Sequence, residues 1–129
     1  MSGCICTKRV RAWHDGHCTT CDRDVSESQL MTVVRLVLQA NTGGVWWRNN
    51  IGVAVMDGHR IAYGLGNPGG ADLVGLFLGR FVAVEIKTPR GRQSPEQAEW
   101  QRLVEAKGGI YAIVRSESEA TELLRKLSA

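Results

Sequence analysis

The amino-acid sequence predicts an α/β protein in which helices flank a mixed central sheet, with a small cysteine-rich appendage at the N-terminal end. Hydrophobic periodicity gives the order helix, several strands, helix, strand, helix. The chain has 129 residues, of which 43% are hydrophobic, and this is enough for one buried core. The four cysteines lie in residues 1–24, where apolar periodicity is absent. We therefore expect an appendage over residues 1–24 and a domain over residues 25–129.

The first predicted helix begins after Ser26. Ser26 and Gln29 have the spacing of a capping box. Apolar residues then recur at helical spacing at Leu30, Val33, Val34, Val37 and Leu38. Asn41 and the glycines behind it favour an end near Ala40.

Short strands are expected next, at Val45 to Arg48, Val53 to Met56 and Arg60 to Gly64. Asp57-Gly58 favours a tight turn between the last two strands. Residues 64–70 are rich in glycine and contain a proline, so they are expected to form a loop.

An antiparallel hairpin follows the glycine-rich loop. Ala71 to Leu78 and Arg80 to Thr88 have strand patterns and are separated by one glycine. Alternation in the second strand puts Glu85 and Lys87 on the same face. Folding at the glycine brings Asp72 opposite residues 85–87, within the ~5 Å typical of cross-strand neighbours.

The rest of the chain alternates helix, strand and helix. A capping box at Ser94 and Gln97 starts a second helix, which ends at Gly108-Gly109. Residues 110–115 have the pattern of a buried strand. Another capping box at residues 116–119 starts a final helix, whose apolar face consists of Ala120, Leu123, Leu124 and Leu127.

The convergence of Asp72, Glu85 and Lys87 suggests a metal site. Two carboxylates close together in a partly buried site repel each other, and a divalent cation relieves that cost. Mg²⁺ takes one or two carboxylates and completes its shell with water and phosphate oxygens, while a lysine orients a water or neutralises charge on phosphate. The indicated chemistry is metal-dependent phosphodiester hydrolysis. The alternative is a cross-strand ion cluster that supports the sheet.

Two helix residues are candidates to join this site. Glu27 precedes Leu30 and Val34 on the inward stripe of the first helix and could bring a third carboxylate. Its alternative role is that of a first-turn acid favoured by the helix dipole. Gln97 lies on the packing face of its helix, and its alternative role is the capping box itself.

Positive charge is concentrated next to these residues. The chain carries 16 Lys and Arg against 13 Asp and Glu, and the excess arises between residues 80 and 92, where Arg80, Lys87, Arg90 and Arg92 oppose only Glu85. Such a local stretch favours a phosphate-bearing partner, and Arg80, Arg90 and Arg92 are the candidate nucleic-acid contacts. The small total excludes a protein that coats nucleic acid by charge alone.

Several ordered motifs together resemble the VRR-NUC nucleases, a branch of the PD-(D/E)XK, restriction-endonuclease-like superfamily. The motifs are Arg48-Asn49-Asn50-Ile51-Gly52, Gly69-Gly70-Ala71-Asp72, Val84-Glu85-Ile86-Lys87, Gln93-Ser94-Pro95-Glu96-Gln97, Gly108-Gly109 and Val114-Arg115-Ser116. The resemblance spans Glu27 to Ser116. Ala71 stands where the family usually has proline, so the rigidity of a proline before the aspartate is lost.

The resemblance implies a restriction-endonuclease-like fold and a set of site residues. Asp72, Glu85, the Ile86 carbonyl and Glu27 would bind Mg²⁺ or Mn²⁺, Lys87 would serve the attacking water, and Gln97 would match the helix glutamine of the family. Arg48 and Asn50 would contact nucleic acid. Small phage and bacterial members of the family are similar to Holliday junction resolvases and act as homodimers on branched DNA, so we expect the same here.

The cysteines are spaced as two close pairs, Cys4-x-Cys6 and Cys18-x-x-Cys21. Four thiolates in a segment without a core fit a structural Zn²⁺ site, in which His14 or His17 could replace one thiol. Free thiols and disulfides are the alternatives, and the lack of an apolar signal segment disfavours disulfides.

Location and activity are the remaining expectations. The longest nearly apolar run is too short to cross a membrane, so we expect a cytoplasmic protein of a bacterium or an infected host cell. The leading hypothesis is an endonuclease acting on branched or Holliday-junction-like DNA. The rival is a non-catalytic, zinc-stabilised nucleic-acid-binding module in which the acidic residues are structural.

Overall fold

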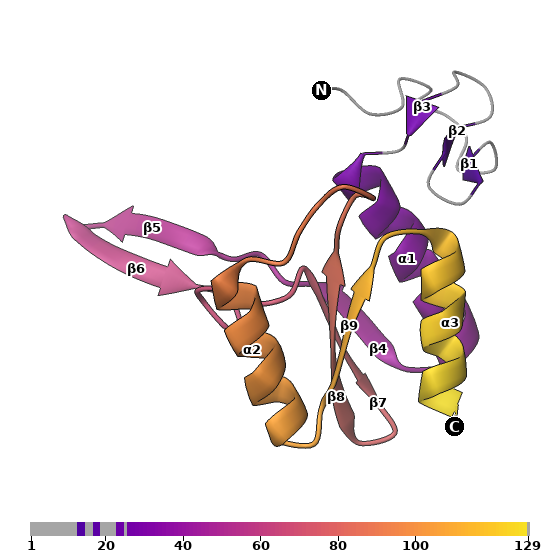
Figure 1. Cartoon of the computed structure of the whole chain (residues 1–129). Helices are drawn as coiled ribbons and strands as arrows, with labels where there is room; N and C mark the ends of the chain where they lie inside the picture. The colour runs from indigo at the N-terminus through magenta and orange to yellow at the C-terminus, as the bar shows by residue number, and fades with distance from the viewer. Residues whose placement is uncertain (1–12, 15–16, 19–22, 25, 129) are drawn as a thin grey trace.

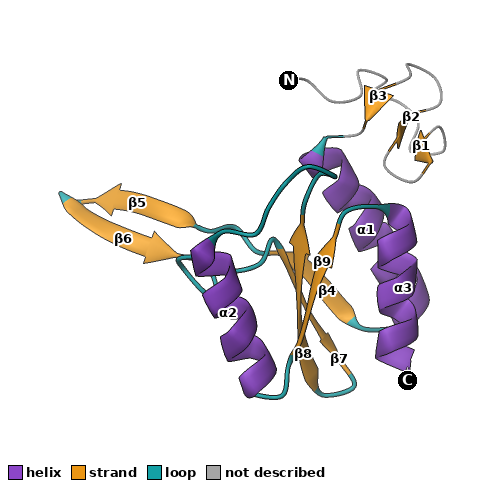
Figure 2. Cartoon of the chain, in the orientation of Figure 1, coloured by secondary structure: helices purple, strands orange, loops and turns teal. Residues whose placement is uncertain are grey.

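The computed structural model describes residues 13–14, 17–18, 23–24 and 26–128. The central sheet has four strands in the order β4-β7-β8-β9, of which only β8 and β9 are parallel. The elements are β1 (Trp13–His14), β2 (His17–Cys18), β3 (Arg23–Asp24), α1 (Glu27–Thr42), β4 (Val45–Arg48), β5 (Gly52–Met56), β6 (His59–Tyr63), β7 (Leu73–Phe77), β8 (Arg80–Ile86), α2 (Pro95–Ala106), β9 (Ile110–Val114) and α3 (Glu117–Ser128). Helices α1 and α3 cover one face of the sheet and α2 covers part of the other (Figure 1, Figure 2).

The helix caps form as the sequence predicts at two of three positions. Ser26 accepts a hydrogen bond from the Gln29 amide at 3.1 Å, and the Gln29 side chain accepts one from the Ser26 amide at 2.8 Å. The box at Ser94 is formed in the same way. At α3 the box is half formed: Ser116 Oγ accepts a hydrogen bond from the Glu119 backbone amide at 3.2 Å, as predicted, but the Glu119 carboxylate accepts from the Arg115 amide, one residue before the expected donor.

The β7–β8 hairpin has the predicted register. Leu73 lies opposite Val84 and Phe77 lies opposite Arg80, so extension of the pairing by one residue sets Asp72 against Glu85. The two residues of the turn, Leu78 and Gly79, have φ values of 49° and 75°. Positive φ at both positions is typical of a type I′ turn, whose twist suits a tight hairpin.

Two apolar clusters fill the spaces on either side of the sheet. The larger cluster joins α1 and α3 to the face of β8 that carries Val82, Val84 and Ile86. The smaller cluster lies under α2 and includes Ala83 and Tyr111. Alternation along β8 therefore divides the strand as the sequence predicts, and Glu85 falls on the face of α2.

Two strand predictions need correction. Strands β5 and β6 and the turn at Asp57-Gly58 form as predicted, but they make a separate two-stranded sheet that projects from the body of the molecule and does not join the central sheet (Figure 1). The strand at residues 110–115 is predicted to be buried, but Ile110, Ala112 and Ile113 are only partly buried. The reason is that β9 is an edge strand, with β8 on one side only.

Among the helices of the described residues, none is both long enough and apolar enough to cross a membrane.

Helix α1 offers a matched test of the larger cluster. Leu38 is 0% exposed and Leu36 is 50% exposed on the same helix. Leu38→Ala should lower the free energy of unfolding by about 2–5 kcal/mol because it leaves a cavity, whereas Leu36→Ala should cost under about 1 kcal/mol. Urea unfolding followed by circular dichroism measures both, and equal losses would contradict this assignment of the core.

Candidate active site

Asp72 is held immediately before β7. Its Oδ2 accepts a hydrogen bond from the Ile86 amide at 2.9 Å, and its backbone carbonyl accepts one from the Asn49 amide at 2.8 Å. The carboxylate is thus fixed between two neighbouring strands.

Glu85 is the one charged side chain of the described residues that is buried, with 2% of its surface exposed. Burial raises the pKa of the Glu85 carboxyl to about 9; a hydrogen bond with Asp72 and the charge of Asp72 act in the same direction, and the Lys87 ammonium opposes them. Its Oε1 is buried without a hydrogen-bond partner. A buried unpartnered oxygen costs about 1–3 kcal/mol, which a bound cation would relieve.

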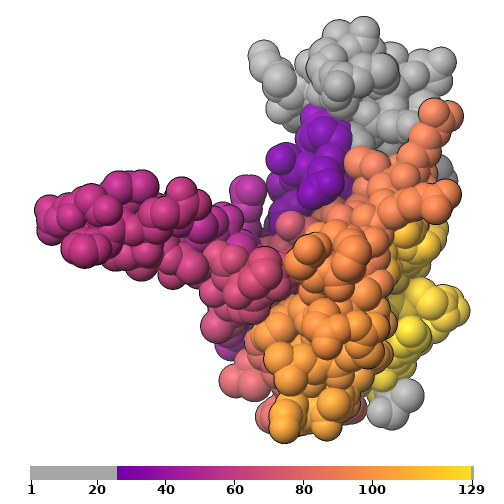
Figure 3. Space-filling model, turned by 60° about the vertical axis from the view of Figure 1, so that its left-hand side comes forward, coloured from indigo at the N-terminus to yellow at the C-terminus, as the bar shows by residue number. Residues whose placement is uncertain are grey.

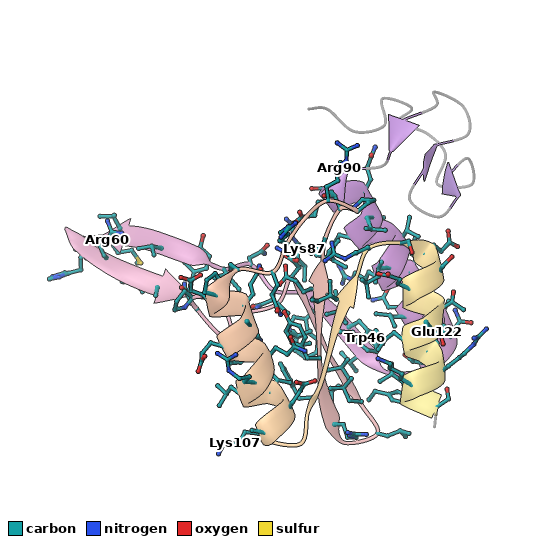
Figure 4. All side chains as sticks on the ribbon, in the orientation of Figure 1. Trp46, Arg60, Lys87, Arg90, Lys107 and Glu122 are labelled. Carbon is teal, nitrogen blue, oxygen red and sulfur yellow. The ribbon has the colours of Figure 1, made fainter. Side chains whose placement is uncertain are left out.

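Lys87 follows Glu85 by two residues and lies beside it. The Lys87 Nζ is 3.7 Å from Glu85 Oε2, and only 14% of the Lys87 side chain is exposed. The Lys87 amide donates to the Val114 carbonyl at 3.1 Å, which fixes its backbone to the end of β9. Figure 4 shows Lys87 at the end of β8, at the end of the sheet where the glycine-rich loop arrives.

Glu27 lies near the same group. It is largely exposed, but partial burial and the charge of Asp72 raise its pKa, while Lys87 lowers it. Glu27 is therefore close enough to Asp72 and Lys87 for their charges to act on it. Within the described part of the chain, however, no three His, Cys, Asp or Glu side chains form a metal-holding group.

The chemistry of the donors fits a hard divalent cation. Asp72 and Glu85 supply two carboxylates, and the Ile86 carbonyl lies in the same stretch of β8. Mg²⁺ commonly takes one or two carboxylates and keeps several waters, so it does not need a third acid. Such an ion would provide a partner for the unpartnered Glu85 Oε1. It would also offset the repulsion between the two carboxylates.

Arg48 and Asn50 line a polar pocket of about 550 Å³ together with Asp72 and Tyr63. The predicted nucleic-acid contacts on this segment therefore lie next to the acidic pair. Arg90 and Arg92 are both in the loop that follows Lys87, and both are exposed. Figure 4 shows Arg90 beyond Lys87, on the loop that leaves the end of β8.

Two predicted residues have other surroundings. The Gln97 side-chain oxygen accepts a hydrogen bond from the Ser94 amide at 2.8 Å, so it is committed to the helix cap. Arg80 begins β8, and its guanidinium points to the Gly108 carbonyl at 3.5 Å. Because Glu85 lies five residues further along the strand, Arg80 is roughly 17 Å from the acidic pair and does not join it.

Asn49 is a positioning residue that the sequence did not single out. Its side-chain amide donates to the Leu65 and Ala71 carbonyls, both at 2.9 Å, and its oxygen accepts from the Leu65 amide at 3.0 Å. These bonds hold both ends of the glycine-rich loop just before Asp72. The motif points to the neighbouring Asn50, but Asn49 makes these hydrogen bonds.

Arg115 is a second positioning residue that the sequence did not reveal. Its Nη1 donates to the Thr88 carbonyl at 3.0 Å and also to the Gly91 carbonyl. The loop that leaves Lys87 is thereby attached to the end of β9. The motif Val114-Arg115-Ser116 was the available signal, although a spacing pattern cannot tell which carbonyls an arginine will reach.

The predicted zinc ligands Cys4, Cys6 and Cys21 lie outside the described residues, and the Cys18 side chain does too, although its backbone belongs to β2.

The fold and the acidic centre define a mixed α/β domain with two carboxylates and a lysine at one end of its sheet. The fold is similar to that of a solved structure described as "VRR_NUC domain", which superposes with a TM-score of 0.55 at 18% sequence identity, covering 77% of this chain and 94% of that chain. At this identity the similarity concerns the fold. The sequence matches no protein-family profile, and no curated protein matches it.

The metal-free protein should lose stability as pH rises. The Glu85 pKa is about 9 in the folded chain against 4.5 in the unfolded one. The folded state therefore retains a proton that the unfolded chain has lost, so this stabilisation is complete below pH 4.5 and disappears as the pH passes 9. Glu85→Gln should flatten this pH profile, and its free energy of unfolding should exceed that of wild type by up to about 5 kcal/mol at pH 8.

Urea unfolding in EDTA at pH 5 and pH 8 measures this difference. Glu122→Gln, which changes an exposed glutamate on α3, is the matched control and should follow wild type. Mg²⁺ at pH 8 should stabilise wild type more than Glu85→Gln. Parallel profiles for wild type and Glu85→Gln would show that Glu85 is not protonated in the fold.

The Arg115 contacts predict a local change. Arg115→Ala removes the donor that holds the Thr88 and Gly91 carbonyls, so the Gly91 amide, which bonds to Thr88 at 3.0 Å, should exchange with solvent at least about tenfold faster. Arg125→Ala removes an exposed arginine from α3 and should leave that rate unchanged. Hydrogen exchange by NMR gives the rate for the Gly91 amide in both variants. Equal rates in the two variants would show that Arg115 does not hold this loop.

Proposed function

We propose that the chain is a divalent-metal-dependent endonuclease that hydrolyses phosphodiester bonds in branched or Holliday-junction-like DNA. The observation that carries the proposal is the buried Glu85 carboxyl beside Asp72, with Lys87 Nζ 3.7 Å from Glu85 Oε2. A structural ion cluster would satisfy each of its oxygens, but Glu85 Oε1 is unpartnered. The fold of a VRR-NUC domain supports the same class of reaction.

The proposed chemistry assigns a task to each residue. Asp72, Glu85 and the Ile86 carbonyl would hold Mg²⁺ or Mn²⁺, with Glu27 beside them. The cation would supply positive charge against the phosphate and a more acidic water. Hydrolysis forms a bond from a water oxygen to phosphorus and breaks one bond from phosphorus to a bridging oxygen. The Lys87 ammonium would orient the attacking water or neutralise charge on the phosphate.

Contacts to the DNA backbone are proposed on both sides of the acidic pair. Arg48 and Asn50 line the polar pocket that contains Asp72, so they suit the phosphate nearest the reaction. Arg90 and Arg92 lie on the loop beyond Lys87 and suit a more distant phosphate.

The remaining proposals concern assembly and location. We propose a homodimer that acts in the cytoplasm of a bacterium or an infected host cell. We also propose that Cys4, Cys6, Cys18 and Cys21 bind one structural Zn²⁺, the usual arrangement for four thiolates in a small segment.

Cleavage of labelled single-stranded, duplex, flap and four-way-junction DNA tests the proposal. Wild type should cut the branched substrates with Mg²⁺ or Mn²⁺ and not with EDTA. Lys87→Ala should reduce cleavage by at least about a hundredfold without loss of DNA binding. Lys107→Ala, which removes an exposed lysine at the far end of α2 (Figure 4), should cut like wild type.

Binding by both wild type and Lys87→Ala without cleavage in either metal would contradict the nuclease. The rival hypothesis would then hold, in which the chain is a nucleic-acid-binding module and the acids are structural.

A further inference from the structure

The hairpin of β5 and β6, residues 52–63, is an arm that leaves the body of the molecule (Figure 3). Its large apolar side chains are exposed: Val53, Val55, Met56, Ile61 and Tyr63. Val55 is the most exposed of the five, with 68% of its surface accessible to solvent. Such a run of exposed apolar side chains on one projecting element is unusual for a surface that faces only water.

The register shows that both faces of the arm are apolar. Val53 lies opposite Ala62, while Ala54 lies opposite Ile61 on the other face. An isolated two-stranded hairpin is marginally stable in water, and among the described residues this one has no sheet or helix over either face. The arm therefore needs a covering surface outside its own strands.

The net charge of the arm argues against a nucleic-acid backbone as the surface that covers it. Asp57 and Arg60 are the formally charged residues of the arm, and their charges cancel. An element that tracks phosphate needs a net positive charge. An apolar protein surface is the better match.

The same chain exposes such a surface on its central sheet. Trp46 is buried on the side of α1 and α3, so alternation turns Val45 and Trp47 to the side of α2. Leu76 lies opposite Val45 on that side and is 51% exposed. Helix α2 packs on β9, at the other edge of the sheet. Val45, Trp47 and Leu76 thus form an open sheet face.

We infer that the arm of one copy packs on the open sheet face of a second copy, and the reverse, in a two-fold dimer. This inference names the interface of the proposed homodimer and depends on that part of the proposed function. The contact is reciprocal, since each chain carries both surfaces, and a two-fold axis closes it at two chains.

The exposed area is sufficient for a stable pair. The five arm side chains and the three sheet side chains are each about half exposed or more, which corresponds to on the order of 100 Å² apiece. Their total of roughly 800 Å² per chain equals the contribution of each partner to an interface of standard size.

The arm is firmly attached where it meets the candidate site. The Asn67 side chain donates to the Gly52 carbonyl at 2.8 Å and to the Tyr63 carbonyl at 3.1 Å, so it holds both strands at their base. Tyr63 also lines the polar pocket that contains Asp72. Packing of the arm on a second copy therefore fixes the direction in which the two candidate sites face.

Complementation between two variants tests the inference. Val55→Asp damages the arm, and Leu76→Asp damages the open sheet face. Each variant alone should lose self-association by at least about tenfold in Kd. A one-to-one mixture should recover dimers, because the intact arm of the Leu76 variant meets the intact sheet face of the Val55 variant. Sedimentation with one variant tagged, in EDTA and without DNA, measures all three samples.

Three results would overturn the inference: a monomeric wild type, a Leu76→Asp variant that dimerises normally, or a mixture that does not recover. The second result would point to contact between arms. Thermal unfolding checks that each variant is folded, and Val45→Thr replaces Leu76→Asp should aspartate disrupt the sheet. Because these measurements need neither metal nor cleavage, failure of the dimer is distinguishable from failure of the nuclease.

Discussion

The antiparallel register of β7 and β8 is the constraint on which the acidic centre depends. The two-residue turn at Leu78 and Gly79 sets this register from one end of the hairpin, and Asp72 and Glu85 meet at the other end. A slip of one residue would turn Glu85 from the α2 side into the apolar cluster under α1 and α3, where a carboxylate has no partner. The conformation of the turn therefore decides whether the two acids, each six residues away from it along the chain, lie next to each other.

Burial of Glu85 is unfavourable for the isolated fold and favourable for a site that must attract a cation. The carboxyl retains a proton to well above neutral pH, and one of its oxygens has no partner. Unfavourable burial of this kind is concentrated at functional sites, because a group whose oxygens are already paired would gain little from a ligand. The hydrogen bonds around Asp72 hold the other acid of the pair in place.

Features fixed by local chemistry could be predicted from the sequence. The capping box at Ser26 depends on residues three apart, and the hairpin register depends on one tight turn. Features fixed by tertiary placement could not be predicted. A strand pattern does not say which sheet a strand joins, so it does not reveal the separate arm of β5 and β6. Counting charge along the chain groups Arg80 with Lys87, although they occupy opposite ends of one strand. The choice between Asn49 and Asn50 depends on side-chain direction, which adjacent residues do not share.

The Arg115 clamp has a consequence for the entropy of binding. The loop with Arg90 and Arg92 leaves Lys87, whose amide bonds to β9, and it is tied back to Arg115 through the Thr88 and Gly91 carbonyls. Ordering a free loop costs about 1–2 kcal/mol per residue in backbone freedom. Here much of that ordering has occurred during folding. A ligand that engages these arginines loses mainly the freedom of two side chains, and more of the interaction energy is available as affinity.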